Sequence, residues 1–305
     1  MTAGRPTRSP LAPAQPSPAP RIVAVPRRRR RLWHRLPGFA ALALLHRRVE
    51  VRLAMAAAFE SPPPERFGFQ FAHAAWLFTV TALLHRWYFR VEAHGIEHLP
   101  AGPVLLVANH GSHVLAWDGA MIVATCLMNA DPPRLAHGMA EHRLMSLPFL
   151  GAAARRIGAV DGVRATCEEL LRAGGVTLTF PEGVNALRKP FRERYRLCAF
   201  GEGFMHVALA TGAPIVPVAV VGAEEEAPLI FNPPWLARLL RTPVAPLSPT
   251  LFVPLPVKHR LHFGEPLWFD GPATPERVTQ HVASVHSTLQ TLVWRGVAER
   301  RHTFF

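Results

Sequence analysis

The sequence predicts an α/β fold with a largely parallel mixed sheet flanked by helices, preceded by a disordered basic tail and membrane-associated helices. Hydrophobic residues make up 49% of the 305 positions, which is enough for a sizeable core. Short apolar runs alternate with helical segments, an order typical of parallel sheets. Twelve of the 34 basic residues and two of the 21 acidic residues lie within residues 1–60, so the rest of the chain is nearly neutral. We therefore expect a tail at 1–35, a membrane-associated helical region at 36–90 and a folded domain at 91–305.

The amino-terminal region is basic and rich in proline. Residues 1–20 contain six prolines among small and polar residues, so they cannot bury a core. An unbroken arginine run at 27–31 is followed by Trp33, Leu36 and Phe39. Basic residues beside aromatic and aliphatic ones suit an anchor at a membrane interface, and a solvated cationic tail is the equal alternative. The expected partner is an anionic membrane surface, not a nucleic acid, because the rest of the chain shows no concentrated basic face or recognition motif.

A second apolar segment extends this region. Residues 67–84 carry no formal charge over eighteen positions, which is the lower limit for a membrane-spanning helix. The segment ends in an aromatic and basic border at 85–90, typical of a membrane interface. We expect a helix that lies in or dips into one leaflet; a spanning helix and a helix packed on the folded domain are the alternatives. The three scattered cysteines form no CxxC pair and favour a reducing compartment, hence the cytoplasmic face of a membrane.

The strands of the folded domain are predicted from short apolar runs. GPVLLVA and APIVPVAVV fit buried strands, and Pro181 stops the strand before it. VKHRLHF alternates between polar and apolar residues and fits a strand nearer an edge. The expected strands are residues 102–108, 134–139, 157–160, 176–180, 213–221 and 257–263.

Helices are expected between these strands. The segment 164–172 is closed by Gly174 and Gly175, the glycines that commonly follow a helix. The expected helices are residues 121–128, 164–172, 203–210 and 275–300. In a parallel sheet, functional loops follow the carboxyl ends of the strands, so polar residues at those ends are the candidates for a site.

Three polar clusters directly follow predicted strands, at residues 109–118, 180–183 and 222–225. In the first cluster, a histidine at the strand end precedes an aspartate at a helix start. A carboxylate fixes the tautomer of an imidazole and stabilises the imidazolium, and the imidazole then takes a proton from a substrate hydroxyl. The sequence has no GxSxG nucleophile motif, and no cysteine lies in these clusters. The pattern therefore favours direct attack by a substrate alcohol over an acyl-enzyme.

Four blocks make the chain resemble the glycerolipid acyltransferases related to bacterial 1-acylglycerol-3-phosphate acyltransferase, the phospholipid-glycerol acyltransferase domain proteins. The blocks are NHGSHVLAWDG at 109–119, GAVDGVRA at 158–165, FPEG at 180–183 and APIVPVAVVGAEE at 213–225. The resemblance implies an acyltransferase domain in which a histidine deprotonates a lipid hydroxyl and an aspartate orients the histidine. It implies a lysolipid or glycerolipid acceptor and an acyl-CoA or acyl-ACP (acyl carrier protein) donor. It implies no metal, no further cofactor and no covalent intermediate.

Two histidines compete for the role of base in this resemblance. Family members usually place four residues between histidine and aspartate, and from His110 that spacing falls on Leu115. His113 with Asp118 keeps the four-residue gap, whereas His110 with Asp118 leaves seven residues, as in a looser branch with an LPWD-like end. The position of His110 after Asn109 and the strand favours His110. A zinc site of both histidines with Asp118 is a further alternative, with no other ligand at suitable spacing.

The same resemblance implies residues for acceptor binding. Pro181, Glu182 and Gly183 match the acceptor-binding block, and Arg164 matches a position linked to phosphate or head-group binding. The alternatives are a strand-end turn for the first three and a surface arginine for Arg164. Members acting on lysophosphatidate often have FPEGTR, whereas VN stands at 184–185 here, which argues against a phosphate-bearing acceptor.

Two further charged groups accompany these blocks. A basic run would hold head-group or CoA phosphates, or would form a solvated face. Its members are Arg188, Lys189, Arg192, Arg194 and Arg196. Glu224 and Glu225 are expected to be structural or to line a pocket. The competing function is a non-catalytic lipid-binding or scaffold protein of the same fold, which the altered His–Asp spacing motivates.

Overall fold

The computed structural model describes residues 38–58, 67–111, 116–146, 149–229 and 253–304, with positions 233, 235, 238, 248 and 250. The chain divides into two compact units, Met1–Leu42 and Ala43–Phe305. In the first unit, the described residues are the beginning of helix α2 (Gly38–Ala57), which continues into the second unit. The second unit carries the sheet. The tail expected at 1–35 lies outside the described residues.

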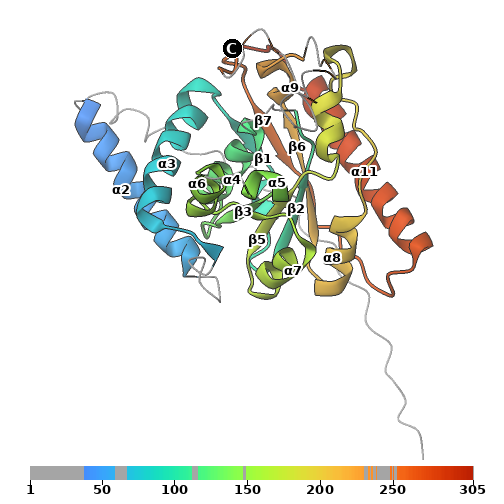
Figure 1. Ribbon diagram of the computed structural model, residues 1–305. Helices are drawn as coiled ribbons and strands as arrows, with labels where there is room; N and C mark the ends of the chain where they lie inside the picture. Colours follow the sequence, from blue (N-terminus) through green and yellow to red (C-terminus); the bar gives the residue numbers. More distant parts are fainter. Residues whose placement is uncertain are drawn as a thin grey trace, which may run out of the picture. The chain divides into compact units, whose positions relative to one another are not determined.

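A seven-stranded sheet forms the centre of the second unit, in the order β1-β7-β6-β2-β5-β3-β4 (Figure 1). The strands are β1 (Glu92–His94), β2 (Val104–Ala108), β3 (Ala136–Ala140), β4 (Val160–Asp161), β5 (Val176–Thr179), β6 (Ile215–Val221) and β7 (Arg260–Phe263). All neighbouring strands are parallel except β6 and β7, which are antiparallel. The α/β fold with a mixed, mostly parallel sheet is thereby confirmed.

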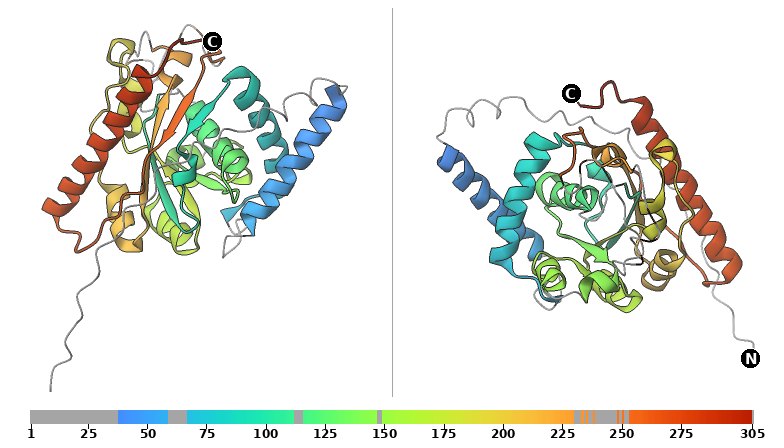
Figure 2. Two further views of the ribbon diagram at one scale, coloured as in Figure 1. Left: turned by 180° about the vertical axis from the view of Figure 1, so that it is seen from behind. Right: turned by 45° about the horizontal axis from the view of Figure 1, so that its top comes forward.

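Helices cover both faces of this sheet because its central strands are apolar on both sides. Leu105 and Val107 of β2 belong to one core with α7 (Arg164–Arg172), α8 (Gly203–Thr211) and α11 (Pro275–Ala298). Leu106 and Ala108 of the same strand belong to a second core with α4 (Trp117–Asn129). Figure 2 shows α11 along one face of the sheet and the helices that follow β2 and β3 on the other. Alternate residues of one strand thus fill two layers, as its pleat requires.

Shorter elements connect these helices and strands. They are α5 (His142–Met145), α6 (Leu150–Arg156), α9 (Ala223–Glu226) and the 3₁₀ turns Ile96–His98, Gly183–Arg188 and Phe191–Glu193. Helix α7 has the bounds that the sequence predicts, whereas α4 begins at Trp117, four residues before its predicted start.

The segment 67–84 folds as α3 (Phe71–Leu83), which continues into a π-helical turn, Leu84–Tyr88. One face of α3 is buried in a cluster that joins Phe78 of α3 with Leu53 of α2 and Leu127 of α4. In the part of the chain that the structure describes, no helix has the length and apolarity needed to cross a membrane. The alternative of packing on the folded domain therefore holds for one face of α3. Its placement in a leaflet stays a prediction.

The expectation of a strand nearer an edge holds for 257–263, although β7 is second from the end of the sheet and not at the edge itself. Strand β7 lies between β1, to which it is parallel, and β6, to which it is antiparallel. The polar members of its alternating pattern are histidines that the fold buries: His259 is 0% exposed and His262 is 6% exposed. Strand β1 takes the edge instead, with only three residues and no apolar run to predict it.

Candidate active site

The loops after β2, β5 and β6 meet at one edge of the sheet, because these three neighbouring strands run parallel. Asn109, the first residue after β2, is buried and attaches its loop to β6. Its Nδ2 donates to the Val220 carbonyl over 3.0 Å, and its Oδ1 accepts from the Val220 amide over 2.7 Å. This double contact fixes the position of the residue that follows.

That residue, His110, contacts the aspartate of the same sequence block. Nδ1 of His110 lies 2.7 Å from Oδ2 of Asp118 at the start of α4. Asp118 is fully buried, and its oxygens also accept from the backbone amides of Gly111 (3.0 Å) and Gly119 (2.7 Å). Three donors therefore hold the carboxylate in one orientation. With Nδ1–H donating to Asp118, Nε2 of His110 carries the lone pair.

The surroundings of His110 make it a stronger base than an ordinary histidine. Burial disfavours the imidazolium most strongly, but the carboxylates of Asp118, Glu182 and Glu226 together outweigh it and raise the pKa of His110. The ring of Phe180 lies against the imidazole with centroids 4.5 Å apart. The His110 side chain keeps 12% exposure, which leaves an approach for a substrate.

Glu182 supports the His110 loop from the neighbouring strand end. Its Oε1 accepts from the backbone amide of His110 over 3.2 Å, and its Oε2 accepts from the amide of Cys198 over 2.7 Å. The preceding Pro181 and following Gly183 form the turn after β5, and Gly183 adopts a positive φ of 55° that favours glycine. The strand-end turn is thus present, while acceptor binding by these three residues stays a prediction.

A buried lysine joins Glu182 to a second carboxylate. Nζ of Lys189 lies 3.8 Å from Oε2 of Glu182 and 3.0 Å from Oε1 of Glu224, and it donates to the Arg196 carbonyl over 2.9 Å. The Lys189 side chain is only 4% exposed. Burial raises the pKa of Glu224 to about 7, against the opposing effect of Lys189. Sequence reasoning missed this role, because it placed Lys189 in a run of solvated cations. One signal was present: the chain has only two lysines among its 34 basic residues.

Comparisons with known proteins agree with this geometry. Residues 90–221 match the family model described as Acyltransferase. The chain carries an Acyltransferase-family domain. The resemblance predicted from the four sequence blocks is thereby confirmed. A crystal structure of the 1-acyl-sn-glycerophosphate (LPA) acyltransferase PlsC from Thermotoga maritima matches with a TM-score of 0.51 at 20% identity, over 75% of this chain and 80% of that chain. At this identity the likeness concerns the fold alone.

Curated relatives of the acyltransferase domain come from bacteria and vertebrates. An uncharacterized protein of Mycobacterium tuberculosis is 38% identical over 232 residues, which are 72% of this chain and 64% of the relative. A protein of Gallus gallus named "DGAT1/2-independent enzyme synthesizing storage lipids" is 28% identical over 207 residues, covering 66% of this chain and 58% of the relative. The human protein of that name is 26% identical, covering 69% and 66%. The chain thus spans less than two thirds of the length of the first of these relatives.

Two further predicted site residues are Arg164 and His113. Arg164 begins α7, its side chain is 56% exposed, and its Nε donates to Glu168 on the same helix over 2.6 Å. This is the surface-arginine alternative, and head-group binding by Arg164 stays a prediction. His113 lies outside the described residues. Among the residues that are described, no group of three or more metal-ligating side chains is present.

Glu225, the second glutamate after β6, forms an ion pair with Arg300. Nη1 and Nη2 of Arg300 both donate to Glu225, and Nη1 also donates to the Tyr195 hydroxyl over 3.2 Å. This hydroxyl accepts from the Gly222 amide over 3.0 Å. Glu225 thus ties the segment after α11 to the segment after β6.

Proposed function

We propose that this protein is a membrane-associated O-acyltransferase of phospholipid or glycerolipid biosynthesis. It moves a fatty acyl group from acyl-CoA or acyl-ACP to a hydroxyl of a lysolipid or glycerolipid. The observation that supports this most directly is the 2.7 Å contact between Nδ1 of His110 and the buried carboxylate of Asp118. The Acyltransferase family match over residues 90–221 supports the reaction class.

The proposed reaction uses His110 as a general base and then as a general acid. Nε2 of His110 takes the proton of the acceptor hydroxyl while its oxygen attacks the thioester carbonyl. Asp118 holds the imidazole in the required tautomer and stabilises the imidazolium that forms. The tetrahedral intermediate then collapses, the carbon–sulfur bond breaks, and His110 returns the proton to the leaving thiolate. The products are the ester and the free thiol.

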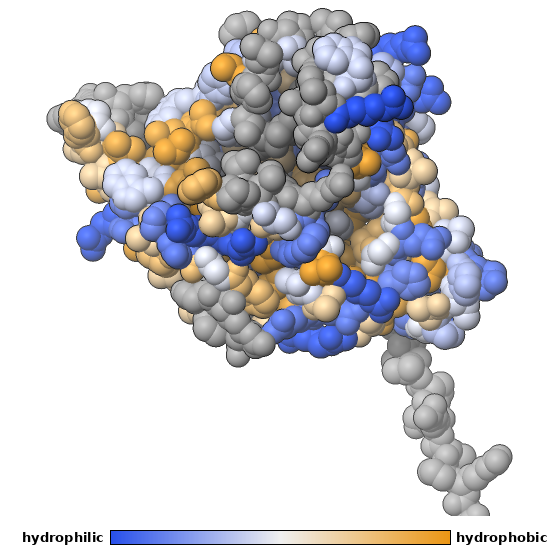
Figure 3. Space-filling view, viewed as in Figure 1, coloured by the Kyte–Doolittle hydropathy of each residue, from blue (hydrophilic) through white to orange (hydrophobic). Residues whose placement is uncertain are grey.

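The proposed membrane association rests on the outer face of α3. Trp76, Leu77 and Val80 are 55%, 40% and 49% exposed, while the opposite side of the helix is buried. Figure 3 shows apolar side chains over this helix, on the left of the view. Trp87 and Arg86, in the turn after α3, supply the aromatic and basic residues that favour a membrane interface. We propose that this surface contacts anionic lipids at the cytoplasmic face of a membrane.

The reaction is tested by release of free CoA from long-chain acyl-CoA in the presence of single acceptors. The panel holds lysophosphatidate, lysophosphatidylcholine, monoacylglycerol and diacylglycerol, and a second series uses acyl-ACP. Acceptor-dependent release that His110→Ala abolishes supports an acyltransferase. Liposome binding with no turnover of either donor would instead favour the non-catalytic lipid-binding protein.

A further inference from the structure

A pocket opens beside the catalytic loop, against the residue that follows His110. It holds about 310 Å³ of space, part of it open to solvent. Gly111 lines it together with the apolar side chains of Leu187, Phe191 and Leu229. Such a wall suits the hydrocarbon part of a lipid. The sequence suggested only Glu224 as a lining residue, because the walls of the pocket come from three separate segments: Gly111, 186–191 and 224–229.

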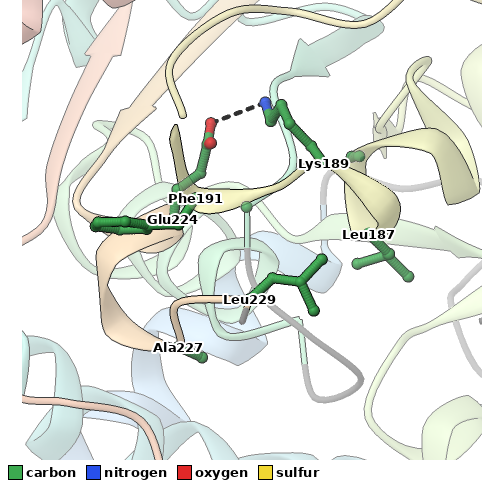
Figure 4. Close-up of a pocket in the computed structure, with 8 residues that line it drawn as sticks. Leu187, Lys189, Phe191, Glu224, Ala227 and Leu229 are labelled. Atoms are coloured by element: carbon green, nitrogen blue, oxygen red, sulfur yellow. Dashed lines mark hydrogen bonds and ion pairs between the residues drawn. The ribbon is translucent and has the colours of Figure 1, made fainter. Parts of the chain in front are cut away.

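The pocket has one polar end, which Lys189 and Glu224 form. Figure 4 shows their contact above the side chains of Leu187 and Leu229, with Lys189 directed toward the carboxylate. Glu224 is held in place by the Tyr195 amide, which contacts both carboxylate oxygens at 3.1 Å. The polar end is therefore rigid and mostly buried, which is the arrangement that orients a ligand rather than merely attracting it.

The polar end lies directly against the backbone of the catalytic loop. A Cβ atom added to Gly111 would lie 2.4 Å from Cγ of Glu224 and 2.8 Å from its backbone nitrogen. Only a glycine allows this approach. A head group that contacts Glu224 is thus held beside the backbone of Gly111, the residue that follows His110.

The charges at this end do not suit a phosphate ester. Lys189 supplies one positive charge, and the carboxylates of Glu182 and Glu224 both face it. Two arginines of the same basic run pair with other carboxylates, since Arg192 contacts the half-exposed Glu193 and Arg194 contacts the buried Glu225. A phosphomonoester with two negative charges would meet an excess of carboxylates, whereas an uncharged hydroxyl donates to one of them.

We propose that this pocket binds the head of the acceptor, with Glu224 and Lys189 recognising the hydroxyls of an uncharged glycerol ester and rejecting a phosphate ester. The proposal rests on the function proposed above and names the acceptor class of the same site. Glu224 accepts a hydrogen bond from one glycerol hydroxyl, Lys189 donates to a second oxygen, and the apolar wall holds the first part of the acyl chain.

The test measures binding separately from turnover. Calorimetric titration of the full chain in detergent compares 1-octanoylglycerol with 1-octanoyl lysophosphatidate, which differ only in the phosphate. We expect the uncharged ester to bind at least about tenfold more tightly, since a charged group buried without a counter-charge is strongly disfavoured. Glu224→Gln, which keeps the shape of the side chain, should weaken binding of the uncharged ester about tenfold, the effect typical of a hydrogen bond to a charged group.

Controls separate this proposal from the proposed reaction. Glu193→Gln lies in the same segment on a half-exposed side chain and should bind like the wild type. His110→Ala should bind the uncharged ester and fail in turnover. Equal or tighter binding of lysophosphatidate, no binding of either ester, or unchanged binding by a folded Glu224→Gln would each overturn the pocket proposal. Normal binding without turnover by the wild type would instead contradict the reaction.

Discussion

The imidazole of His110 contacts the carboxylate of Asp118 at 2.7 Å, although seven residues separate the two in the sequence. The backbone amides of Gly111 and Gly119 donate to the same carboxylate and help the histidine to hold its orientation. The usual four-residue spacing is therefore not required for the pair to form. The wider spacing gave reason to doubt catalysis, and the geometry removes that reason.

Replacing the carboxylate tests its role directly. Asp118→Asn keeps the size of the side chain, but its amide can donate a hydrogen to Nδ1 and so favours the wrong tautomer of His110. We expect kcat to fall by about 10²- to 10⁴-fold, the range typical of a lost general base. The exposed pair of His142 and Asp161, with Nδ1 and Oδ2 2.6 Å apart, provides the matched control, and Asp161→Asn should retain full activity. Wild-type kcat in Asp118→Asn would contradict this role.

The pH dependence of turnover follows from the raised pKa of His110. The base acts when neutral, so kcat/KM should fall as the pH drops through this pKa, with a midpoint above the ordinary value of 6.5. In Asp118→Asn the opposing effect of burial remains, so the midpoint should move to lower pH. Stopped assays from pH 5 to pH 9 measure both profiles. A midpoint that does not move between the two proteins would show that Asp118 does not set it.

Replacement of the buried Lys189 should lower the stability of the protein. Lys189→Met leaves Glu182 and Glu224 without the cation between them, and the free energy of unfolding should fall by about 3–5 kcal/mol, as when one partner of a buried ion pair is removed. Urea unfolding at pH 8 measures the change. Adding Glu224→Gln to Lys189→Met should restore part of the loss, because one uncompensated charge disappears. A double variant less stable than either single variant would contradict the coupling.

Asn109, which attaches the His110 loop to β6, is expected to affect both stability and turnover. Asn109→Ala removes two buried hydrogen bonds to Val220 and leaves both backbone groups of that residue without this partner. We expect unfolding free energy to fall by about 2 kcal/mol, the usual cost of unsatisfied buried groups. Turnover should fall as well, because His110 is the next residue. Unchanged kcat in a folded Asn109→Ala protein would show that the anchor does not position the base.

Polar substitutions on the outer face of α3 should weaken membrane binding. Trp76→Ser with Val80→Ser removes exposed apolar area and the stacking of Trp76 on His46 of α2, and it leaves the buried side of the helix unchanged. Flotation with anionic liposomes should show a smaller bound fraction than for wild type. Trp294→Ser, on a similarly exposed tryptophan of α11 at 58% exposure, is the control and should bind normally. Equal loss in both proteins would indicate a non-specific effect of removing tryptophan.

Local patterns predicted much of the fold. Segment 164–172 ends at glycines and forms α7 with the predicted bounds, and the apolar run before Asn109 forms β2. Strand β1 was missed because its three residues carry no apolar pattern and gain their place only by pairing with β7. The burial of the β7 histidines was not predicted for the same reason, since it depends on distant neighbours.

The candidate site likewise has a part that the local sequence predicted and a part that it did not. His110 and Asp118 belong to one sequence block, so a motif was enough to predict their contact, while the competing His113 lies outside the described residues. Lys189 contacts Glu182 and Glu224, which follow two different strands. In the sequence it stands in a run of basic residues, which is typical of a solvated surface. Contacts between distant segments leave no local periodicity, so only the three-dimensional arrangement distinguishes this lysine from the arginines around it.

Release of CoA from a long-chain acyl-CoA, measured with and without each acceptor for wild type and His110→Ala, tests the central claim most directly. We predict acceptor-dependent release by the wild type, larger with monoacylglycerol or diacylglycerol than with lysophosphatidate, and release at the uncatalysed rate by folded His110→Ala. His142→Ala should behave like the wild type. Equal acceptor-dependent release by wild type and His110→Ala would contradict catalysis by the His110–Asp118 pair.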